Sequence, residues 1–327
     1  TAAAAAVKGV RSHVRYALTG TPIENRLSEL WSIFDFLIPG YLFGYDVFRN
    51  EFESPIVKNE DQAALERLQR MTVPFILRRM KQNVLKDLPE KMEESRYVKF
   101  ESSQQQLYDA QVIHMKQKIA MQDAQEFQKN KMQILAELTK LRQICCDPVL
   151  CFENYKGGSA KLEACKDLVC SAVEGGHKIL LFSQFTSMLE LVAKRMDQEK
   201  ISFYTITGAT PKEKRLQFVK AFNEDDTRVF LISLKAGGVG LNLTGADVVI
   251  HYDPWWNLAV QNQATDRAHR IGQEKRVVVY KLIAKGTIEE KIQKLQESKR
   301  VLSEQVIQGE AGQLAAMSRE DFMALLS

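Results

Sequence analysis

The second half of the chain alternates short apolar runs with amphipathic segments. Five runs rich in β-branched and aromatic residues predict strands: 178–183, 203–207, 229–233, 248–253 and 277–283. Apolar positions at helical spacing predict helices in three of the intervals: 188–197, 212–222 and 258–269. Strands that are apolar on both faces and alternate with helices are typical of a parallel sheet covered on both sides. This region therefore predicts a doubly wound α/β domain.

The first half of the chain is mostly helical in pattern. Residues 16–22 predict a short buried strand that enters a Thr, Gly and Pro turn. A helix should follow, because one continuous face is apolar and Pro39 and Gly40 end it. That face consists of Leu27, Leu30, Trp31, Phe34 and Leu37. An amphipathic helix of this kind should pack on a sheet.

Two further stretches separate this helix from the α/β region. Residues 43–101 mix short helical pieces with a basic run and two prolines, so we expect a connector there. Residues 103–144 contain no Gly or Pro and repeat apolar positions at helical spacing, which predicts a long helix or a helical pair. Residues 154–159 should be a linker, and helices are expected at 287–308 and 319–326.

Composition narrows the class of protein. With 327 residues, 45% of them hydrophobic and 26% charged, the chain suits two modest globular domains and is not disordered. No apolar run reaches the roughly 20 residues that a membrane helix needs, so we expect no membrane partner. The net charge of +4 permits a polyanionic partner without requiring one.

The cysteines indicate a reducing compartment, because they form no paired framework and no metal-ligand spacing. We expect structural thiols and no metal site. The five are Cys145, Cys146, Cys151, Cys165 and Cys170.

The loops after the predicted strands hold the candidate chemistry, because ligands gather at the carboxyl ends of parallel strands. After the strand at 229–233, Gly237, Gly238 and Gly240 allow close backbone approach to a phosphate, and Lys235 adds a positive charge. A tight turn with close helix packing is the alternative explanation of these glycines.

A second loop follows the strand at 248–253 and contains Trp255 and Trp256. On the helix expected after it, polar residues recur at spacings of three and four: Gln263, Asp266, Arg267 and Arg270. Guanidinium groups held in fixed geometry suit phosphate and can neutralise charge in phosphoryl transfer. The alternative for the two arginines is a surface ion pair with Asp266 or Glu274.

Several motifs occur together in one order along the chain. They are ALTGTPIEN, LRRMKQNVLKDLPEK, CDPVL, SAKLE, ILLFSQFT, ISLKAGGVGLNLTGADVVIHYDPWWN and QATDRAHRIGQ. Together they resemble the SWI/SNF family of ATP-driven double-stranded DNA translocases, within the superfamily-two helicases. The resemblance runs from about residue 15 to residue 294, and the double Trp followed by DRAHRIGQ is its most specific part. Leu258 departs from the family's usual Pro after WWN, which affects only the expected start of the helix.

The resemblance implies two RecA-like lobes with ATP in the cleft between them and duplex DNA across both. Residues 1–90 would be the end of lobe one with a connector, and 91–158 a helical insertion. Residues 159–300 would be lobe two, the helicase C-terminal domain, and 301–327 a helical tail.

The resemblance also implies roles for individual residues. Coupling of nucleotide to DNA would involve Thr19, Gly20, Thr21 and Trp255. DNA contact would involve Ser183, Gln184, Gly208, Lys235 and Trp256. The nucleotide would meet Gly238, Gly240, Gln263, Asp266, Arg267 and Arg270, with Arg267 and Arg270 as catalytic arginine fingers.

The sequence lacks two parts of such an engine. It contains no G-x-x-x-x-G-K-[ST] phosphate loop and no Asp-Glu box, both of which would lie upstream of Thr1 in a family member. Without them nothing binds the β- and γ-phosphates strongly or activates a water. We therefore expect the C-terminal half of a translocase, nearly inactive alone, with ATP and Mg²⁺ held mainly by the upstream first lobe.

Two other functions are compatible with parts of this pattern. One is a non-catalytic DNA-binding or regulatory module, although +4 is a modest charge for binding through phosphate contacts alone. The other is an RNA helicase of the same superfamily, against which the connector, the helical insertion and the double Trp all count. The expected location is the cytoplasm of a bacterium or archaeon, associated with the nucleoid, or the nucleus of a eukaryote.

Overall fold

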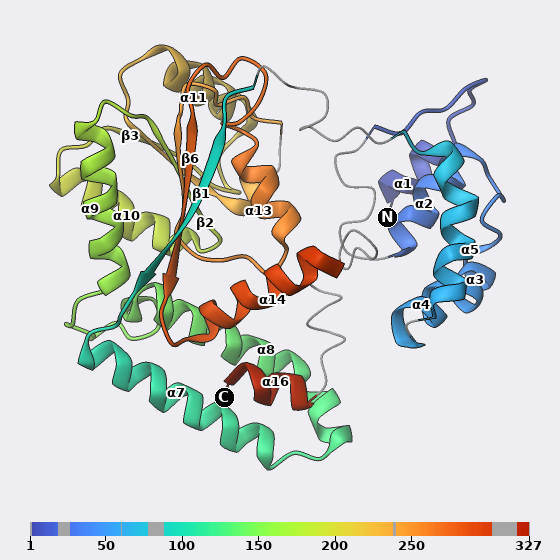
Figure 1. The fold of residues 1–327 in the computed structure, drawn as a ribbon, viewed down its shortest axis with the longest axis horizontal. Coiled ribbons are helices and arrows are strands. Elements are labelled where there is room, and N and C mark those ends of the chain that lie inside the picture. The colour runs from blue at the N-terminus through green and yellow to red at the C-terminus, as the bar shows by residue number, and fades with distance from the viewer. Residues whose placement is uncertain are drawn as a thin grey trace. The chain divides into compact units, whose positions relative to one another are not determined.

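The computed structural model describes residues 2–18, 27–59, 61–77, 88–237, 240–302 and 319–326 (Figure 1). The chain divides into two compact units. Unit 1 comprises Thr1–Lys86 and Leu302–Ala316, and unit 2 comprises Asp87–Val301 and Met317–Ser327. Within the described ranges, no helix combines the length and apolar character needed to cross a membrane.

The described part of unit 1 is a small helical bundle. Its elements are α1 (Ala2–Lys8), α2 (Leu27–Leu37), α3 (Tyr45–Phe48), the π-helical turn η1 (Arg49–Glu53), α4 (Ser54–Asn59), α5 (Gln62–Thr72) and the 3₁₀ turn η2 (Val73–Phe75). The apolar face of α2 is buried as its spacing predicted, with Leu30 and Phe34 packed among Phe48 and Phe52. The expectation that it packs on a sheet is wrong, because its partners in the described part of unit 1 lie in helices and turns. The Asp61 side chain caps α5 by accepting from the backbone N–H of Ala64 at 3.1 Å.

The strand expected at 16–22 is wrong where the structure describes it. Tyr16, Ala17 and Leu18 have no regular secondary structure, and the Leu18 side chain is 99% exposed. An isolated strand leaves its backbone donors and acceptors unpaired, and the described part of unit 1 contains no strand that could pair with this one. Residues 19–22 lie outside the described residues.

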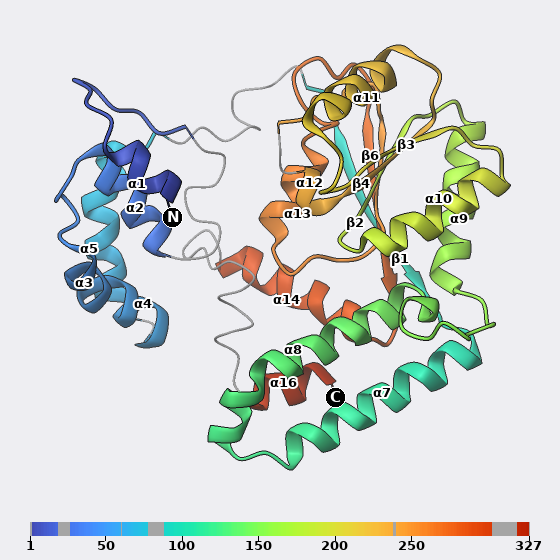
Figure 2. The same ribbon diagram turned by 180° about the vertical axis from the view of Figure 1, so that it is seen from behind.

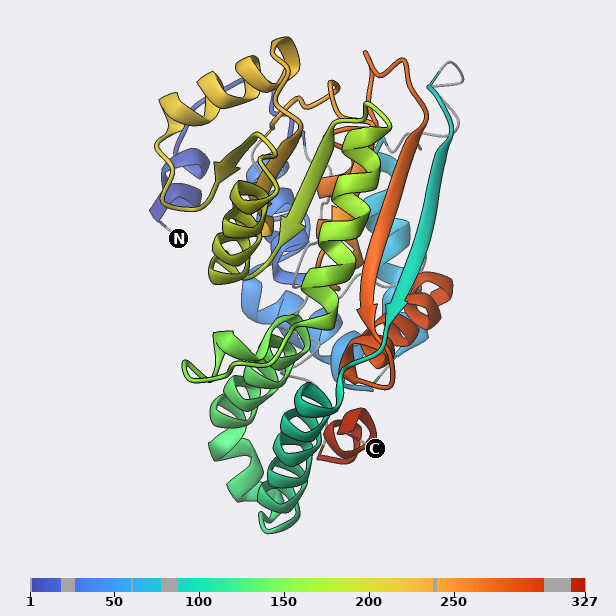
Figure 3. The same cartoon turned by 90° about the vertical axis from the view of Figure 1, so that its left-hand side faces the viewer.

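Unit 2 is built on a six-stranded parallel sheet in the order β1-β6-β5-β2-β4-β3. The strands are β1 (Lys91–Val98), β2 (Ile179–Ser183), β3 (Phe203–Ile206), β4 (Val229–Ser233), β5 (Val248–His251) and β6 (Val277–Ala284). All five pairings are parallel. Figure 3 shows β1, in teal, at the edge of the sheet and β6, in orange, beside it. The doubly wound α/β fold is therefore confirmed.

Strand β1 corrects the assignment of its region as a connector and the start of a helical insertion. Half of its sequence, KMEESRYV, is charged, and it has neither the alternation nor the apolar run of a buried strand. Among the strands that the structure describes, β1 pairs only with β6, along the register from Lys91 opposite Val277 to Val98 opposite Ala284. Charged side chains on an edge strand discourage pairing with another chain. Its composition therefore fits an edge strand, and for the same reason the sequence pattern did not predict a strand here.

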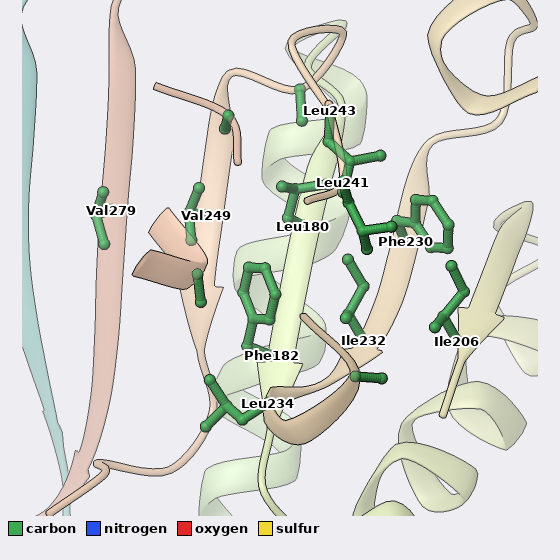
Figure 4. Close-up of a cluster of buried hydrophobic side chains, with 14 of the residues drawn as sticks. Leu180, Phe182, Ile206, Phe230, Ile232, Leu234, Leu241, Leu243, Val249 and Val279 are labelled. Atoms are coloured by element: carbon green, nitrogen blue, oxygen red, sulfur yellow. The ribbon is translucent and has the colours of Figure 1, made fainter. Parts of the chain in front are cut away.

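Helices cover both faces of the sheet, and alternate strand residues point to opposite sides. On one face Leu180, Phe182, Phe230 and Ile232 pack with residues of α11 (Lys212–Glu224), α12 (Leu234–Gly237) and α13 (Leu258–Thr265), as Figure 4 shows for the strand residues. On the other, Ile179, Leu181 and Leu231 pack against α9 (Ala160–Glu174) and α10 (Thr186–Gln198). Central strands apolar on both sides thus join two cores.

A helical hairpin packs against the same unit (Figure 2). It consists of α7 (Ser102–Ala120) and α8 (Ala124–Cys146), followed by the 3₁₀ turn η3 (Pro148–Leu150). The helical pair expected at 103–144 is thus confirmed. The remaining helices are α14 (Ile288–Leu302) and α16 (Arg319–Leu326), and the expected extension of α14 to residue 308 lies outside the described residues. In α16, Phe322 meets the Phe127 ring of α8 at 5.8 Å.

All five cysteines are free thiols, and Cys145, Cys146 and Cys165 are completely buried. Burial raises the pKa of the Cys165 thiol to about 12. A thiol in such surroundings stays protonated and behaves as a small hydrophobic side chain.

Candidate functional site

The loop after β2 is organised by a buried carboxylate at the end of β5. The Ser183 hydroxyl donates to Asp253 Oδ1 at 2.5 Å, and the backbone N–H of Gln184 donates to the same carboxylate at 3.2 Å. Ser183 has no exposed surface and Asp253 is 1% exposed. Ser183 therefore holds the loop in its conformation through this buried bond. The Gln184 Nε2 atom is also buried, and it has no hydrogen-bond partner.

The two tryptophans after β5 are also buried, each about 8% exposed. Trp255 joins the core beside α13, where its backbone N–H donates to Gln261 Oε1 at 3.3 Å and its carbonyl accepts from Gln296 of α14. The Trp256 ring lies 5.6 Å from the guanidinium carbon of Arg142 in α8. The segment therefore connects the sheet edge to two other helices.

The loop that holds Gly208 follows β3 and is fastened by one arginine. Arg215 donates through Nε to the Thr210 carbonyl at 2.7 Å and through Nη2 to the carbonyls of Thr207 and Gly208 at 3.1 and 3.0 Å. The Thr210 hydroxyl in turn accepts from the backbone N–H of Thr207. Because these carbonyls are bonded to Arg215, the loop has a fixed shape. The sequence analysis did not predict this role, because Arg215 belongs to none of the motifs.

The helix expected at 258–269 is shorter than predicted. α13 ends at Thr265, and the chain then turns, with Arg267 N–H donating to Ala264 and Ala268 N–H to Thr265. The Arg267 carbonyl is captured by the backbone N–H of Leu243 at 3.0 Å, which pulls the chain off the helical path. The proposed single helix face with Gln263, Asp266, Arg267 and Arg270 is therefore wrong, because only Gln263 lies on the helix.

The turn nevertheless brings the two arginines together beside the Gly-rich segment. Arg270 Nη1 donates to the carbonyl of Leu241 at 3.4 Å, next to Gly240 with its positive φ of 30°. Burial lowers the pKa of Arg267, and the positive charge of Arg270 lowers it further, while Asp266 opposes both. Two guanidinium groups that repel each other in a half-buried position suit a shared anionic ligand.

Two buried polar residues fix this turn region, Gln273 through backbone carbonyls and His251 through a side-chain hydroxyl. Gln273 is 6% exposed, and its Nε2 lies within hydrogen-bond distance of the carbonyls of Thr244, Ala246 and Ala268, at 2.8 to 3.1 Å. The Nε2 atom of His251, in β5, lies 2.9 Å from the Oγ1 atom of Thr265, the last residue of α13. Neither role was expected from the sequence, because both depend on partners that only folding brings near.

The structure divides the candidate residues between two places. Ser183, Gln184, Gly208 and Trp256 follow the carboxyl ends of β2, β3 and β5. Arg267 and Arg270 instead lie where the chain returns towards the amino ends of the strands, since Gln273 bonds to Ala246 just before β5. A parallel sheet requires this return, because each strand must begin at the same edge. The predicted DNA and nucleotide residues thus occupy different parts of unit 2.

Some predicted site residues cannot be placed. Thr19, Gly20, Thr21 and Gly238 lie outside the described residues. Lys235 belongs to α12, directly after β4, and its side chain is not described. Their predicted roles stay predictions.

Comparison with known proteins covers nearly the whole chain. Residues 1–150 match the SNF2-related domain family, and residues 160–272 match the helicase conserved C-terminal domain family. An uncharacterised ATP-dependent helicase of Mycoplasma genitalium is 40% identical over 325 residues, which cover 98% of this chain and 30% of the relative. The mouse SWI/SNF-related matrix-associated actin-dependent regulator of chromatin subfamily A member 1 is 37% identical over 321 residues, covering 92% of this chain and 30% of that protein.

Similar solved structures indicate the same family as the sequence comparisons. The Sulfolobus solfataricus SWI2/SNF2 ATPase core in complex with double-stranded DNA is 36% identical, with a TM-score of 0.63, covering all of this chain and 69% of that one. The parallel sheet of unit 2 is therefore a RecA-like lobe of a helicase-like ATPase. The chain belongs to the SWI/SNF family, also written SWI2/SNF2. It spans about 30% of the length of the curated relatives described above.

Proposed function

We propose that this chain works as the C-terminal half of an ATP-dependent double-stranded DNA translocase. The observation that carries the proposal is the Arg270 guanidinium at the Leu241 carbonyl, beside Gly240, with Arg267 near enough for the two positive charges to repel each other. Guanidinium groups at this position would neutralise the charge that develops on phosphate during hydrolysis. We assign both arginines as fingers that complete an ATP site, with Gly238, Gln263 and Asp266 around it.

The residues of this turn fit the phosphate part of ATP and not the whole cofactor. Two guanidiniums and a glycine backbone can meet phosphate oxygens, but the sequence has neither a phosphate loop nor an Asp-Glu box. When bound, Mg²⁺-ATP supplies the phosphoanhydride whose hydrolysis drives movement. We assign most of its binding to an upstream first lobe, and we expect this chain alone to be nearly inactive.

DNA binding is assigned to the loops at the carboxyl edge of the sheet. The Sulfolobus relative was solved with double-stranded DNA, which supports duplex DNA as the partner here. Gly208 in its exposed loop and Lys235 after β4 are the proposed phosphate contacts. Ser183, Gln184 and Trp256 would set the shape of the surface, and Trp255 with Thr19, Gly20 and Thr21 would couple it to the nucleotide. Such a protein would act in the cytoplasm of a bacterium or archaeon, or in the nucleus of a eukaryote.

The test is ATP hydrolysis by the full-length protein with and without duplex DNA, in wild-type, Arg270→Ala and Arg276→Ala forms. Arg276 is a matched control, because it is an exposed arginine near the same turn and pairs with Glu90. Duplex DNA should stimulate the wild type and Arg276→Ala. Arg270→Ala should abolish hydrolysis and leave DNA affinity nearly unchanged.

Other results would identify the competing functions. Absence of DNA-dependent turnover in the wild type would favour a non-catalytic DNA-binding module. Stronger stimulation by single-stranded RNA than by duplex DNA would favour an RNA helicase. A large loss of DNA affinity in Arg270→Ala would contradict its assignment as an arginine finger.

A further inference from the structure

A buried polar cluster joins the helical hairpin to the carboxyl edge of the sheet. Its centre is Asp253, which holds the loop after β2 through Ser183 and the backbone of Gln184. The same residue begins the segment that leads to the two tryptophans. One carboxylate therefore fixes two loops that are about 70 residues apart in the sequence.

Arg142 of α8 contacts both of these loops from the hairpin side. Its Nη2 donates to the carbonyl of Pro254 at 2.6 Å, directly after Asp253. Its guanidinium carbon lies 5.6 Å from the centre of the Trp256 ring and 5.9 Å from that of Phe185, which follows Gln184. A planar guanidinium can stack on aromatic rings and donate in its own plane at once, which lysine cannot do.

Electrostatics tie the arginine to the carboxylate. Burial raises the pKa of Asp253, and the charge of Arg142 and the bond from Ser183 oppose that rise. Arg142 is itself only 4% exposed. A buried positive charge is costly unless an opposite charge and hydrogen-bond acceptors compensate it, and for Arg142 the Asp253 carboxylate and the Pro254 carbonyl contribute to this compensation.

Hydrogen bonds other than that of Arg142 also attach the hairpin to the rest of the unit. Gln104 of α7 donates to the Ile144 carbonyl within the hairpin, and the Tyr108 hydroxyl accepts from the backbone N–H of Ile288 in α14. The Cys146 carbonyl accepts from the hydroxyls of Tyr252 and Ser159, at 3.0 and 2.8 Å. Since these bonds hold α7 and α8 in place, the guanidinium of Arg142 is available to hold the loops.

We propose that Arg142 is a positioning residue through which the α7–α8 hairpin sets the shape of the loops after β2 and β5. Its partner in this role is Asp253. The effect on DNA rests on the proposed function, because these loops are the assigned DNA-facing edge. The effect on loop geometry does not rest on it.

The first readout is fluorine NMR of the full-length protein labelled with fluorotryptophan, with Trp256→Phe used to assign the Trp256 resonance. Arg142→Gln should shift that resonance, because it removes both the cation over the ring and the bond to Pro254. Arg142→Lys should shift it less. Lys140→Gln is the control, because Lys140 is on the same helix and lies over the Phe152 ring instead. An unchanged Trp256 resonance in Arg142→Gln would overturn the proposal.

The second readout is the duplex DNA concentration that half-maximally stimulates ATP hydrolysis. Arg142→Gln should raise it by about tenfold, the scale of one buried charge-assisted hydrogen bond, while turnover at saturating DNA changes little. Arg142→Lys should recover part of the loss and also serves if the glutamine variant does not fold. The positioning role would be overturned if Arg142→Gln changed turnover at saturating DNA as much as the half-maximal DNA concentration, or if Arg142→Lys recovered none of the loss. Either result would indicate a general folding defect. A wild type without DNA stimulation would contradict the proposed function, and the NMR result would still decide the geometry.

Discussion

Mild acid should destabilise unit 2 through His251, which is completely buried in β5. Its ring stacks on Phe182 with the ring centres 5.6 Å apart, and its Nδ1 has no hydrogen-bond partner. If Nε2 carries the proton and donates to Thr265, the threonine hydroxyl can donate onward to the Gln261 carbonyl. A second proton, on Nδ1, would have no acceptor, so the site favours the neutral imidazole.

The pKa of His251 is lowered from 6.5 to about 3, chiefly by burial and next by the charge of Lys281. Lys281 lies opposite His251 in the neighbouring strand β6. Glu93 and Lys91 on β1 act in opposite directions, Glu93 raising the pKa and Lys91 lowering it. The folded protein therefore keeps this histidine neutral while the unfolded chain takes up a proton below pH 6.5.

Because the pKa of His251 is lower in the folded protein than in the unfolded chain, acid reduces the free energy of unfolding. A lowered pKa in the folded state means that stability is complete above the unfolded value and decreases as the pH falls towards the folded value. Between about pH 7.5 and about pH 5.5, protonation of the unfolded chain alone costs the folded state ~1.4 kcal/mol. His251→Gln keeps a side-chain donor near Thr265 but does not titrate.

The assay is urea unfolding of a Trp31→Phe background, in which only Trp255 and Trp256 of unit 2 report. His251→Gln should be less stable than the parent at about pH 7.5, and its free energy of unfolding should fall by ~1.4 kcal/mol less than that of the parent on going to about pH 5.5. Parallel losses in both proteins would refute the reasoning, because other groups would then account for the whole pH dependence.

Three other substitutions test the contacts that shape unit 2. Lys161→Met should lower the free energy of unfolding by about 3–5 kcal/mol, because it leaves the completely buried Glu289 carboxylate without its cation, and adding Glu289→Gln should recover part of this loss in urea unfolding. Arg215→Ala should weaken binding to duplex DNA in a fluorescence anisotropy titration, because three loop carbonyls lose their donor; unchanged affinity would mean that the Gly208 loop is not at the DNA. Gln273→Ala should lower the thermal midpoint, since the buried carbonyls that share its amide would lose it, at a cost of about 1–3 kcal/mol.

Edge strands and turns escaped sequence reasoning for identifiable reasons. β1 carries charges because only β6 pairs with it, so its pattern resembled that of a connector. The end of α13 is decided by Leu243, which takes the Arg267 carbonyl from another segment of the chain. Asp253 and Arg142 are separated by more than a hundred residues from each other, and no spacing rule links them.

The central part of the fold could be predicted because its physical cause is local. Strands buried on both faces must be apolar throughout, and helices covering a sheet must have one apolar side, so the runs at β2, β4 and β5 and the face of α2 were readable from the chain. The motifs that resemble the SWI/SNF family were readable for the same reason, since each lies within one short segment.

Tertiary structure alone decided how the functional side chains are held. The arginines at 267 and 270 were recognisable as residues, but their meeting beside Leu241 depends on a turn made by a distant backbone N–H. Ser183 was expected to touch DNA, yet its hydroxyl is committed to Asp253 in the interior. The hydrophobic periodicity of a helix or strand lies within that segment, so the sequence determined these elements. Hydrogen bonds and buried charges join segments that are far apart in the sequence, so only folding established those contacts.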